Sequence, residues 1–289
     1  MSGLSFVVEG VNFQHGRLIK ADPRLNLGSL LLLEPARDGT VSVPETLRNY
    51  AADSFQALSG SRVESVAVTD ALSGVAGCKA EMTAKGGLHG IVANTALPAA
   101  TRTRLAGATP AELINYLIAN PNHAYYMGMI GRVTRNNAVP DYTTVALGGV
   151  SPQTDFSGST NVGFGVAQAR EGGNIAGQPV PGNGFFTGRR VDANPLYFSD
   201  IGVSGHNIAS AAALAQGRGE IFTMGERVNT ATIAGWPSHI LYTMWIEDLT
   251  VSGRTYAQAS AEGLALFQER TSSGGRYAED SWTAPASLA

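Results

Sequence analysis

The segment from His239 to Val251, HILYTMWIEDLTV, constrains the fold of this chain more than any other stretch. Alternate residues of a β-strand point to opposite faces of the sheet. Both resulting sets are apolar: Ile240, Tyr242, Met244 and Ile246 on one side, and Leu241, Trp245, Leu249 and Val251 on the other. We therefore expect a central strand that is covered by protein on both faces.

Turn signals recur every several residues between Tyr142 and Ala234, with short strand candidates between them. These candidates are TTVALGG (143–149), NVGFGVAQ (161–168), NGFFTGRRV (183–191), LYFSDIG (196–202) and EIFTMGERV (220–228). Short strands at this spacing with few helices are typical of a β-sandwich or jelly roll. The predicted fold class is therefore mainly β, an antiparallel β-sandwich with a few short helices.

Two segments in the first half have the apolar spacing of amphipathic helices. Thr46–Leu58 is one, with Thr46 as its N-cap. Gly107–Pro121 is the other, with Thr109 as its cap and Pro110 at the first helical position. A long strand, 123–135, follows the second helix directly.

A third helix is predicted after a turn at Ser252–Gly253. Its apolar positions at helical spacing are Ala257, Ala261, Leu264 and Phe267, so it should pack back on the sheet. The tail beyond it, 272–289, looks extended and partly free. A short helix of one or two turns is possible at Ser210–Gln216.

The N-terminal region contributes strands at Leu4–Val11 and Ser29–Leu33, the latter ended by Pro35. We divide the chain into residues 1–60, strands and a short helix packed on the main domain, and residues 61–289, the β-sandwich with its C-terminal helix and tail. RVESVAVT (62–69) alternates like a strand. The Gly-rich stretch 73–97 fits either strands or an ordered loop.

Composition excludes several classes of function. The net charge is −3 without a long basic run, so nucleic acid is not an expected partner. No apolar run is long enough to insert into a membrane, and no signal peptide is visible. Cys78 is the sole cysteine, which excludes an internal disulfide and fits synthesis in the cytoplasm.

The charged fraction is low, at 15%, and the basic residues are nearly all arginine. The lysines are Lys20, Lys79 and Lys85. Arginine forms planar, two-pronged bonds with carboxylates and tolerates interfaces better than lysine. Together with the abundant glycine, this composition favours a chain that assembles with other protein.

The adjacent carboxylates Glu247 and Asp248 are the most conspicuous candidate for chemistry. Neighbouring strand residues face opposite sides, so the two cannot converge on one substrate atom. A glycosidase needs carboxyls that face each other across the scissile bond. Glu220 and Glu226 are further candidates by type, but no spacing pairs them. We interpret Glu247 and Asp248 as the polar end of a strand, solvated or paired with a residue such as Arg254.

No spacing indicates a metal or cofactor. The histidines are scattered, at His15, His89, His123, His206 and His239. Asp155–Ser159 matches a D-x-S-x-S string used for Mg²⁺ in βα-alternating domains, but here a plain turn fits better. Gly163–Ala169 begins G-x-G without the rest of a dinucleotide fingerprint. We expect no cofactor and no catalytic residue.

Aromatic side chains are the remaining candidates for ligand contact, by stacking on sugars. They are Trp236, Trp245, Trp282, Tyr125, Tyr126 and Tyr197. Trp245 is expected in the core. Trp236, in a loop, and Trp282, in the tail, are better placed to touch a ligand or a neighbouring subunit, although packing is the more common role.

Three segments in order resemble a known family: GSLLLLEPARDGTVSVPETLRNYAAD (28–53), TPAELINYLIANPNHAYYMGMIGRVTR (109–135) and LYTMWIEDLTVSGRTYAQASAEGLALFQERTSSGGRYAEDSW (241–282). They are similar to structural proteins of the tail, baseplate or tail fibre of tailed bacteriophages. Those proteins carry a concanavalin A-like (LamG-like) jelly-roll domain.

The resemblance implies a virion component in the tail that acts in assembly and host adsorption. Its partners would be other copies of itself, commonly as a homotrimer, and other phage tail proteins. A host-surface glycan or receptor is a further possible partner if the chain is an adhesin module. A glycan-degrading enzyme on the same fold is a third alternative. The family supplies no catalytic residues, so we expect no enzymatic activity.

Overall fold

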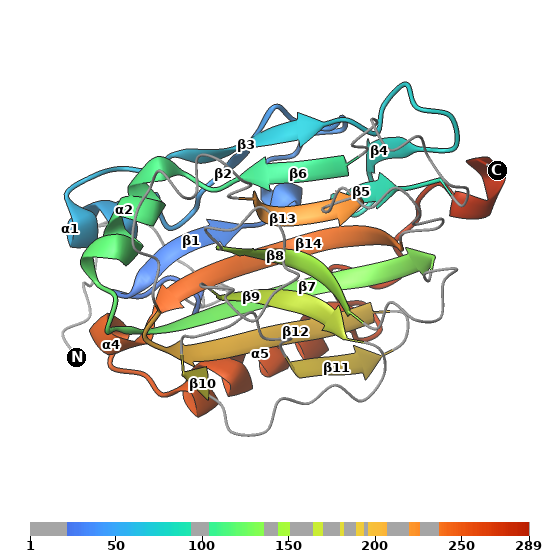
Figure 1. Ribbon diagram of the computed structural model, residues 1–289. Coiled ribbons are helices and arrows are strands. Elements are labelled where there is room, and N and C mark those ends of the chain that lie inside the picture. Colours follow the sequence, from blue (N-terminus) through green and yellow to red (C-terminus); the bar gives the residue numbers. More distant parts are fainter. Residues whose placement is uncertain are drawn as a thin grey trace, which may run out of the picture.

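A computed structural model describes residues 22–93, 104–135, 144–150, 164–169, 180–181, 189–193, 196–206, 220–225 and 237–288; between 144 and 193 it describes the backbone alone. These residues form the two-layered, mainly β structure shown in Figure 1. The predictions at Leu4–Val11, Asp155–Ser159 and Ser210–Gln216 lie outside the described residues, and so does most of NGFFTGRRV (183–191).

The larger sheet has eight strands, ordered β10-β12-β7-β14-β5-β4, with β1 paired to β14 and β11 paired to β12. Its strands are β10 (Val180–Pro181), β12 (Leu196–Ser204), β7 (Ala124–Arg135), β14 (Ser238–Asp248), β5 (Leu88–Ile91), β4 (Lys79–Met82), β1 (Ser29–Leu33) and β11 (Arg189–Ala193). All pairs are antiparallel except β10 with β12. The described part of residues 1–60 therefore shares a sheet with later strands.

The second layer contains the four-stranded sheet β13-β6-β3-β2 and the hairpin β8-β9. Its strands are β13 (Glu220–Gly225), β6 (Arg104–Ala108), β3 (Ser65–Asp70), β2 (Thr46–Arg48), β8 (Thr144–Val150) and β9 (Phe164–Ala169). The mainly β, antiparallel sandwich class is thus confirmed. The concanavalin A-like jelly-roll topology stays a prediction.

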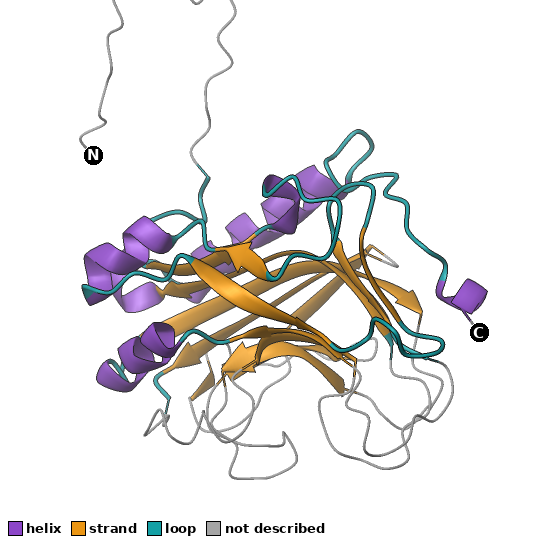
Figure 2. Ribbon diagram, turned by 90° about the horizontal axis from the view of Figure 1, so that it is seen from above, coloured by secondary structure: helices purple, strands orange, loops and turns teal. Residues whose placement is uncertain are grey.

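Two hydrophobic clusters lie on opposite faces of the large sheet. One packs β14, β7 and β1 against the smaller sheet, through side chains such as Met244, Leu31 and Phe222. The other packs β14, β7 and β12 against the long helix α5 (Tyr256–Thr271), through side chains such as Trp245, Phe198 and Phe267. In Figure 2 most of the helices lie along one side of the strands, and one helix lies at the lower left on the opposite side. The expectation that 239–248 is covered on both faces is confirmed, because every residue of β14 is buried.

The assignment of side chains to the two faces of β14 was partly wrong. Ile240 and Tyr242 lie with Trp245 in the α5 cluster, whereas Leu241 lies with Met244 in the inter-sheet cluster. The register with β7 shifts between Leu241 and Thr243. Such a β-bulge inserts one extra residue and reverses the alternation beyond it.

Two helix starts also differ from the prediction. Thr46 does not cap a helix; it begins β2, and α1 covers only Ala52–Ser59. The side chain of Asn49 bonds the backbone nitrogens of Leu32 and Ala51, each at 2.9 Å, so the strand ends there. The second helix, α2, covers Ala111–Ala119 and has Pro110 itself, in extended conformation, as its N-cap in place of Thr109.

The buried face of α5 was predicted only in part: Phe267 is buried and Leu264 packs against the same cluster, as expected. Ala257 and Ala261 are exposed, whereas the helix packs through Ala259, Ser260, Gly263, Leu266 and Phe267. A capping box between Thr255 and Gln258 sets where the helix begins. The small residues on the buried face give a weak hydrophobic pattern, which explains the error.

The tail is not free. Tyr277 is fully buried and stacks on Tyr242 with ring centroids 4.3 Å apart. Asp280 accepts hydrogen bonds from the Tyr242 hydroxyl and the Lys85 amide, both at 2.8 Å. A 3₁₀ turn covers Pro285–Leu288, the last described residues.

For the Gly-rich stretch 73–97, the structure shows strands within the described residues 73–93: the hairpin β4-β5, with β4 at the edge of the large sheet. Another 3₁₀ turn, Pro35–Arg37, follows β1, and the short helix α4 (Leu249–Ser252) follows β14. No helix in the described part of the chain combines the length and apolar character needed to cross a membrane.

Candidate functional site

The carboxylates at the end of β14 are buried, so of the two predicted alternatives, solvation and pairing, solvation was wrong. Glu247 forms an ion pair with Arg254, whose Nε donates to Oε1 at 2.8 Å. The same guanidinium also contacts Glu262 on α5. The predicted pairing with Arg254 is therefore confirmed. Through Arg254, Glu247 of β14 is linked to Glu262 of α5.

Asp248 has a different set of partners. Its Oδ2 accepts a hydrogen bond from the Tyr116 hydroxyl at 2.7 Å and lies 2.6 Å from Nδ1 of His123. Its Oδ1 accepts from the Val251 amide at 3.1 Å and so caps α4. Burial, together with the nearby Asp248 carboxylate, raises the pKa of Tyr116. Because Glu247 and Asp248 contact separate residues, they do not face each other across a common space.

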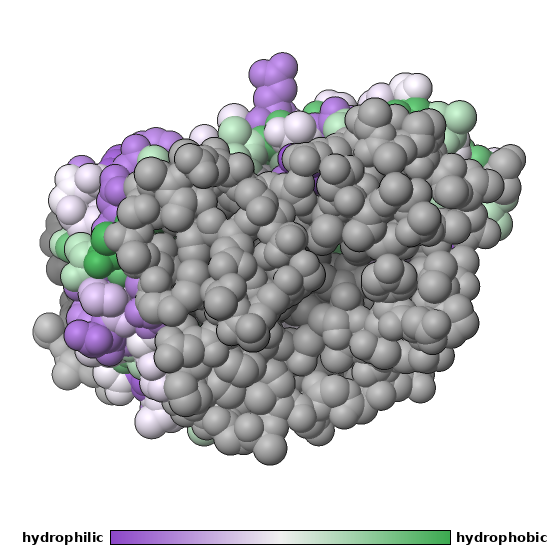
Figure 3. Space-filling model, in the orientation of Figure 1, coloured by the Kyte–Doolittle hydropathy of each residue, from purple (hydrophilic) through white to green (hydrophobic). Residues whose placement is uncertain are grey.

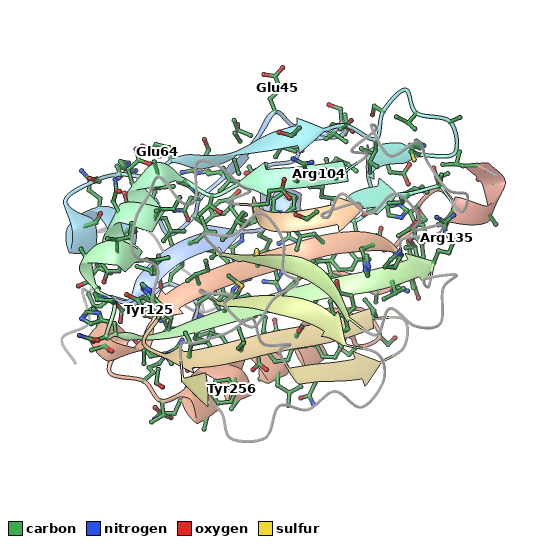
Figure 4. All side chains as sticks on the ribbon, in the orientation of Figure 1. Glu45, Glu64, Arg104, Tyr125, Arg135 and Tyr256 are labelled. Carbon is green, nitrogen blue, oxygen red and sulfur yellow. The ribbon has the colours of Figure 1, made fainter. Side chains whose placement is uncertain are left out.

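His123 forms part of the wall of a cavity between α1 and α2, with a volume of about 450 Å³. The wall includes Ser59 at the end of α1, Glu112 and Asn115 on α2, Asn120 directly after α2, and Val251 of α4. The His123 side chain is 29% exposed, whereas Asp248 behind it has no exposed surface. Figure 4 shows the neighbouring Tyr125 at the α4 end of β7, opposite the end that carries Arg135.

A second polar cluster surrounds Glu34, whose side chain is fully buried. Its carboxylate contacts the guanidinium groups of Arg24 (2.6 Å), Arg37 (2.9 Å), Arg270 (2.9 Å) and Arg276 (3.0 Å). Burial raises the pKa of Glu34, but these cations outweigh burial and hold it below its ordinary value. The cluster joins the N-terminal strand region to α5 and the tail.

Sequence reasoning missed the Glu34 cluster. The available signal was a carboxylate placed directly after the apolar run Leu30–Leu33, since a buried carboxylate requires a partner. The preference for arginine over lysine was a second signal. The contact between His123 and Asp248 joins residues 125 positions apart, and no local pattern could reveal it.

The remaining predicted carboxylates form no facing pair among the described residues. Glu220 forms an ion pair with Arg104 at 2.6 Å and accepts a hydrogen bond from Thr223. Glu226 lies outside the described residues.

The other described histidines are buried. His89 bonds Glu81 at 3.0 Å and Thr134 at 2.9 Å, and burial lowers its pKa. Burial also lowers the pKa of His206, to about 4. His239 lies edge-on to Tyr197. Within the described ranges no group of three or more metal-ligating side chains comes together; His15 lies outside them.

The aromatic candidates pack inside the molecule. Tyr125, Tyr126, Tyr197 and Trp245 are all buried. Trp282 is half-buried in the tail, with the Arg132 guanidinium 4.8 Å from its ring centre. Trp236 lies outside the described residues.

A larger, more open groove of about 710 Å³ lies between the turn after β1, the β4-β5 turn and the tail. Its charged lining residues are Lys85 and Arg276, and no carboxylate lines it. It therefore differs in charge from the cavity at His123, which is lined by the acidic Glu112 and by no lysine or arginine.

Comparison with known proteins adds little. No protein-family model and no curated protein matches the chain. Among solved structures, Trypanosoma rangeli sialidase in complex with sialic acid is similar over 83% of this chain, with 11% sequence identity and a TM-score of 0.29. The chain spans 32% of that enzyme's length. A TM-score this low carries no argument about fold, site or activity.

Proposed function

We propose that this chain is a structural component of a bacteriophage virion, in the tail tip, baseplate or tail-fibre region, acting in assembly and host adsorption. The resemblance of 28–53, 109–135 and 241–282 to phage tail proteins motivates the proposal. Its proposed partners are further copies of the chain, as a homotrimer, and other tail proteins.

The observation that carries the proposal is the structural use of Glu247 and Asp248. Both lie in 241–282, the longest of the three segments that carry the resemblance. Both form internal contacts that hold helices against the central strand. A glycosidase site would instead have two carboxylates that face a substrate. This supports a non-enzymatic role for the segment.

The proposal is tested on particles and on the isolated chain. An antibody or tag label on this protein should appear at the tail of intact particles in electron micrographs. Light scattering of the purified chain should give the mass of a trimer. Label found only in the unassembled fraction, combined with a monomer in solution, would refute the proposal.

An adhesin module of the tail is the second candidate. The feature that favours it is the pair of hollows at the surface, the cavity at His123 and the groove at Lys85, which differ in charge. Whole-cell binding by the purified chain would support this alternative. A glycan-degrading activity stays the least supported reading, and release of sugar from host polysaccharide would be its assay.

A further inference from the structure

The two ring nitrogens of His123 have different environments. Nδ1 lies 2.6 Å from Asp248 Oδ2, and an ionised carboxylate can only accept a hydrogen bond. In the neutral ring Nδ1 therefore carries the proton, and Nε2 is left as an acceptor. No hydrogen bond joins Nε2 to another described residue, and the ring lies in the cavity wall.

Asp248 holds this ring in one orientation. The carboxylate is fully buried, and it is itself fixed by the Tyr116 hydroxyl and the Val251 amide. A buried carboxylate behind a partly exposed histidine sets both the tautomer and the direction of the ring, as at functional histidines in general. Asp248 thus fixes the ring of His123 in the cavity wall.

The rest of the wall offers a mixture of polar and apolar groups. Glu112 and Asn115 project from the exposed side of α2 and bond no other described side chain. The side-chain nitrogen of Asn120 donates a hydrogen bond to the Tyr116 carbonyl, which leaves the side-chain oxygen as an acceptor for a ligand. Leu58 and Val251 add apolar surface. Figure 3 shows hydrophilic and apolar residues next to each other on the side where Figure 1 places α1 and α2.

From this arrangement we infer that the cavity between α1 and α2 binds an uncharged, hydroxyl-rich ligand: a neutral saccharide unit. Sugar hydroxyls both donate and accept, so they match His123 Nε2, Asn115 and Glu112 together. The C–H face of a sugar ring matches Leu58 and Val251. The volume of about 450 Å³ suits one or two sugar rings.

The charge of the cavity wall favours a neutral saccharide over an acidic one. No lysine or arginine lines the cavity, and Glu112 would repel an anion. An acidic glycan would instead be drawn to the groove with Lys85 and Arg276. The inference rests on the adhesin alternative and does not depend on membership of the tail.

The test uses the purified full-length chain on an array of neutral and acidic oligosaccharides, followed by calorimetric titration of the hits. Neutral oligosaccharides should bind. His123→Ala and Asn115→Ala should each weaken binding about tenfold or more, as expected when a hydrogen bond to the ligand is lost. The matched control Gln268→Ala, on the exposed side of α5, should leave binding unchanged. Unchanged melting temperatures show that the variants are folded.

A second measurement examines the ring directly. Nitrogen NMR of the ¹⁵N-histidine-labelled chain at pH 8 should show His123 with the proton on Nδ1, and Nε2 should shift when the oligosaccharide is added. Binding of acidic glycans alone, unchanged affinity in both variants, no binding at all, or a proton on Nε2 would each overturn the inference. None of these outcomes bears on whether the label appears on particles, so the two proposals fail independently.

Discussion

Glu34 is the residue on which the most cations converge in the described part of the chain. Its carboxylate holds guanidinium groups from before β1, from α5 and from the tail. Removing one partner of a buried ion pair leaves the other charges without compensation. The structural role of Glu34 therefore exceeds that of a surface carboxylate.

Glu34→Gln should lower the free energy of unfolding by about 3–5 kcal/mol, because it leaves the surrounding arginines uncompensated in a buried site. Urea denaturation measures the change. The control is Glu64→Gln, which removes a carboxylate that is 65% exposed and paired with Arg62. That variant should change stability by less than about 1 kcal/mol. Equal effects of the two substitutions would contradict a special role for Glu34.

Two titratable side chains should make stability fall towards acid pH in successive ranges. Burial lowers the pKa of His206 from 6.5 to about 4, so the unfolded chain binds the proton first and stability declines between those values. Burial raises the pKa of Glu81, but bonds from Lys79, Thr283 and His89 outweigh it and lower the pKa from 4.5 to about 2. The contribution of Glu81 is complete above pH 4.5 and is lost as the pH falls towards 2.

Thermal unfolding as a function of pH tests both groups. His206→Gln should reduce the slope of stability between pH 6.5 and 4, and Glu81→Gln should reduce it below pH 4.5. Since His89 titrates in the same direction as His206, the first slope should diminish without vanishing. Slopes identical to the parent chain in both variants would show that neither group is linked to folding.

At the scale of elements, the sequence predicted which strands exist better than it predicted where elements begin and which face each side chain occupies. β1, β7 and β14 could be predicted because long apolar runs have few other structures available. The face assignment in β14 failed at Tyr242, since a bulge depends on the partner strand β7 and not on local residues. Thr46 was misassigned because the pairing with β3, which makes it a strand residue, is tertiary.

The site was less predictable than the fold. Strand alternation correctly separated Glu247 from Asp248, because that argument needs only neighbouring residues. The partners of Asp248 are His123 and Tyr116, which belong to the unit formed by α2 and β7. The sequence predicted this helix and this strand, but not which part of β14 they would contact. Burial of both carboxylates followed from that packing and could not be foreseen.

Gly263 provides a test of how α5 packs on the sheet. A methyl group added here would lie 2.6 Å from the Phe198 ring and 3.1 Å from the Trp245 ring. Helix propensity alone would make Gly263→Ala stabilising by about 1 kcal/mol. Because overpacking costs about 1–3 kcal/mol, we expect a net loss of stability.

Chemical denaturation of Gly263→Ala shows whether the substitution raises or lowers the free energy of unfolding. The comparison variant is Ala261→Gly, at an exposed position of the same helix, which should lose about 1 kcal/mol through propensity alone. A Gly263→Ala chain that is more stable than the parent would mean that α5 lies farther from β12 than described.

At the scale of the whole molecule, the tail is an integral part of the fold. Residues 272–288 cover Tyr242 through Tyr277, supply Arg276 to Glu34, and bond the β4-β5 turn through Asp280. Deleting 272–289 should lower the melting temperature by roughly 5–10 °C, since it exposes a buried aromatic pair and removes a cation from Glu34.

Scanning calorimetry measures this change, and deletion of 286–289 alone is the control. Those last residues lie beyond Asp280 and Tyr277, so their removal should have a small effect. Equal melting temperatures for the parent and the longer deletion would show that the tail contacts contribute nothing to stability.

The position of β14 also governs the order in which the chain can fold during synthesis. β14 is made late, yet it lies between β7 on one edge and β1 and β5 on the other. Until Ser238–Asp248 leaves the ribosome, Leu30–Leu33 has no strand of the sheet to join, and β7 can pair only with β12. The nascent chain therefore carries the apolar strand β1 unpaired from its synthesis until that of β14, and its yield in cells should depend on chaperones that shield this strand.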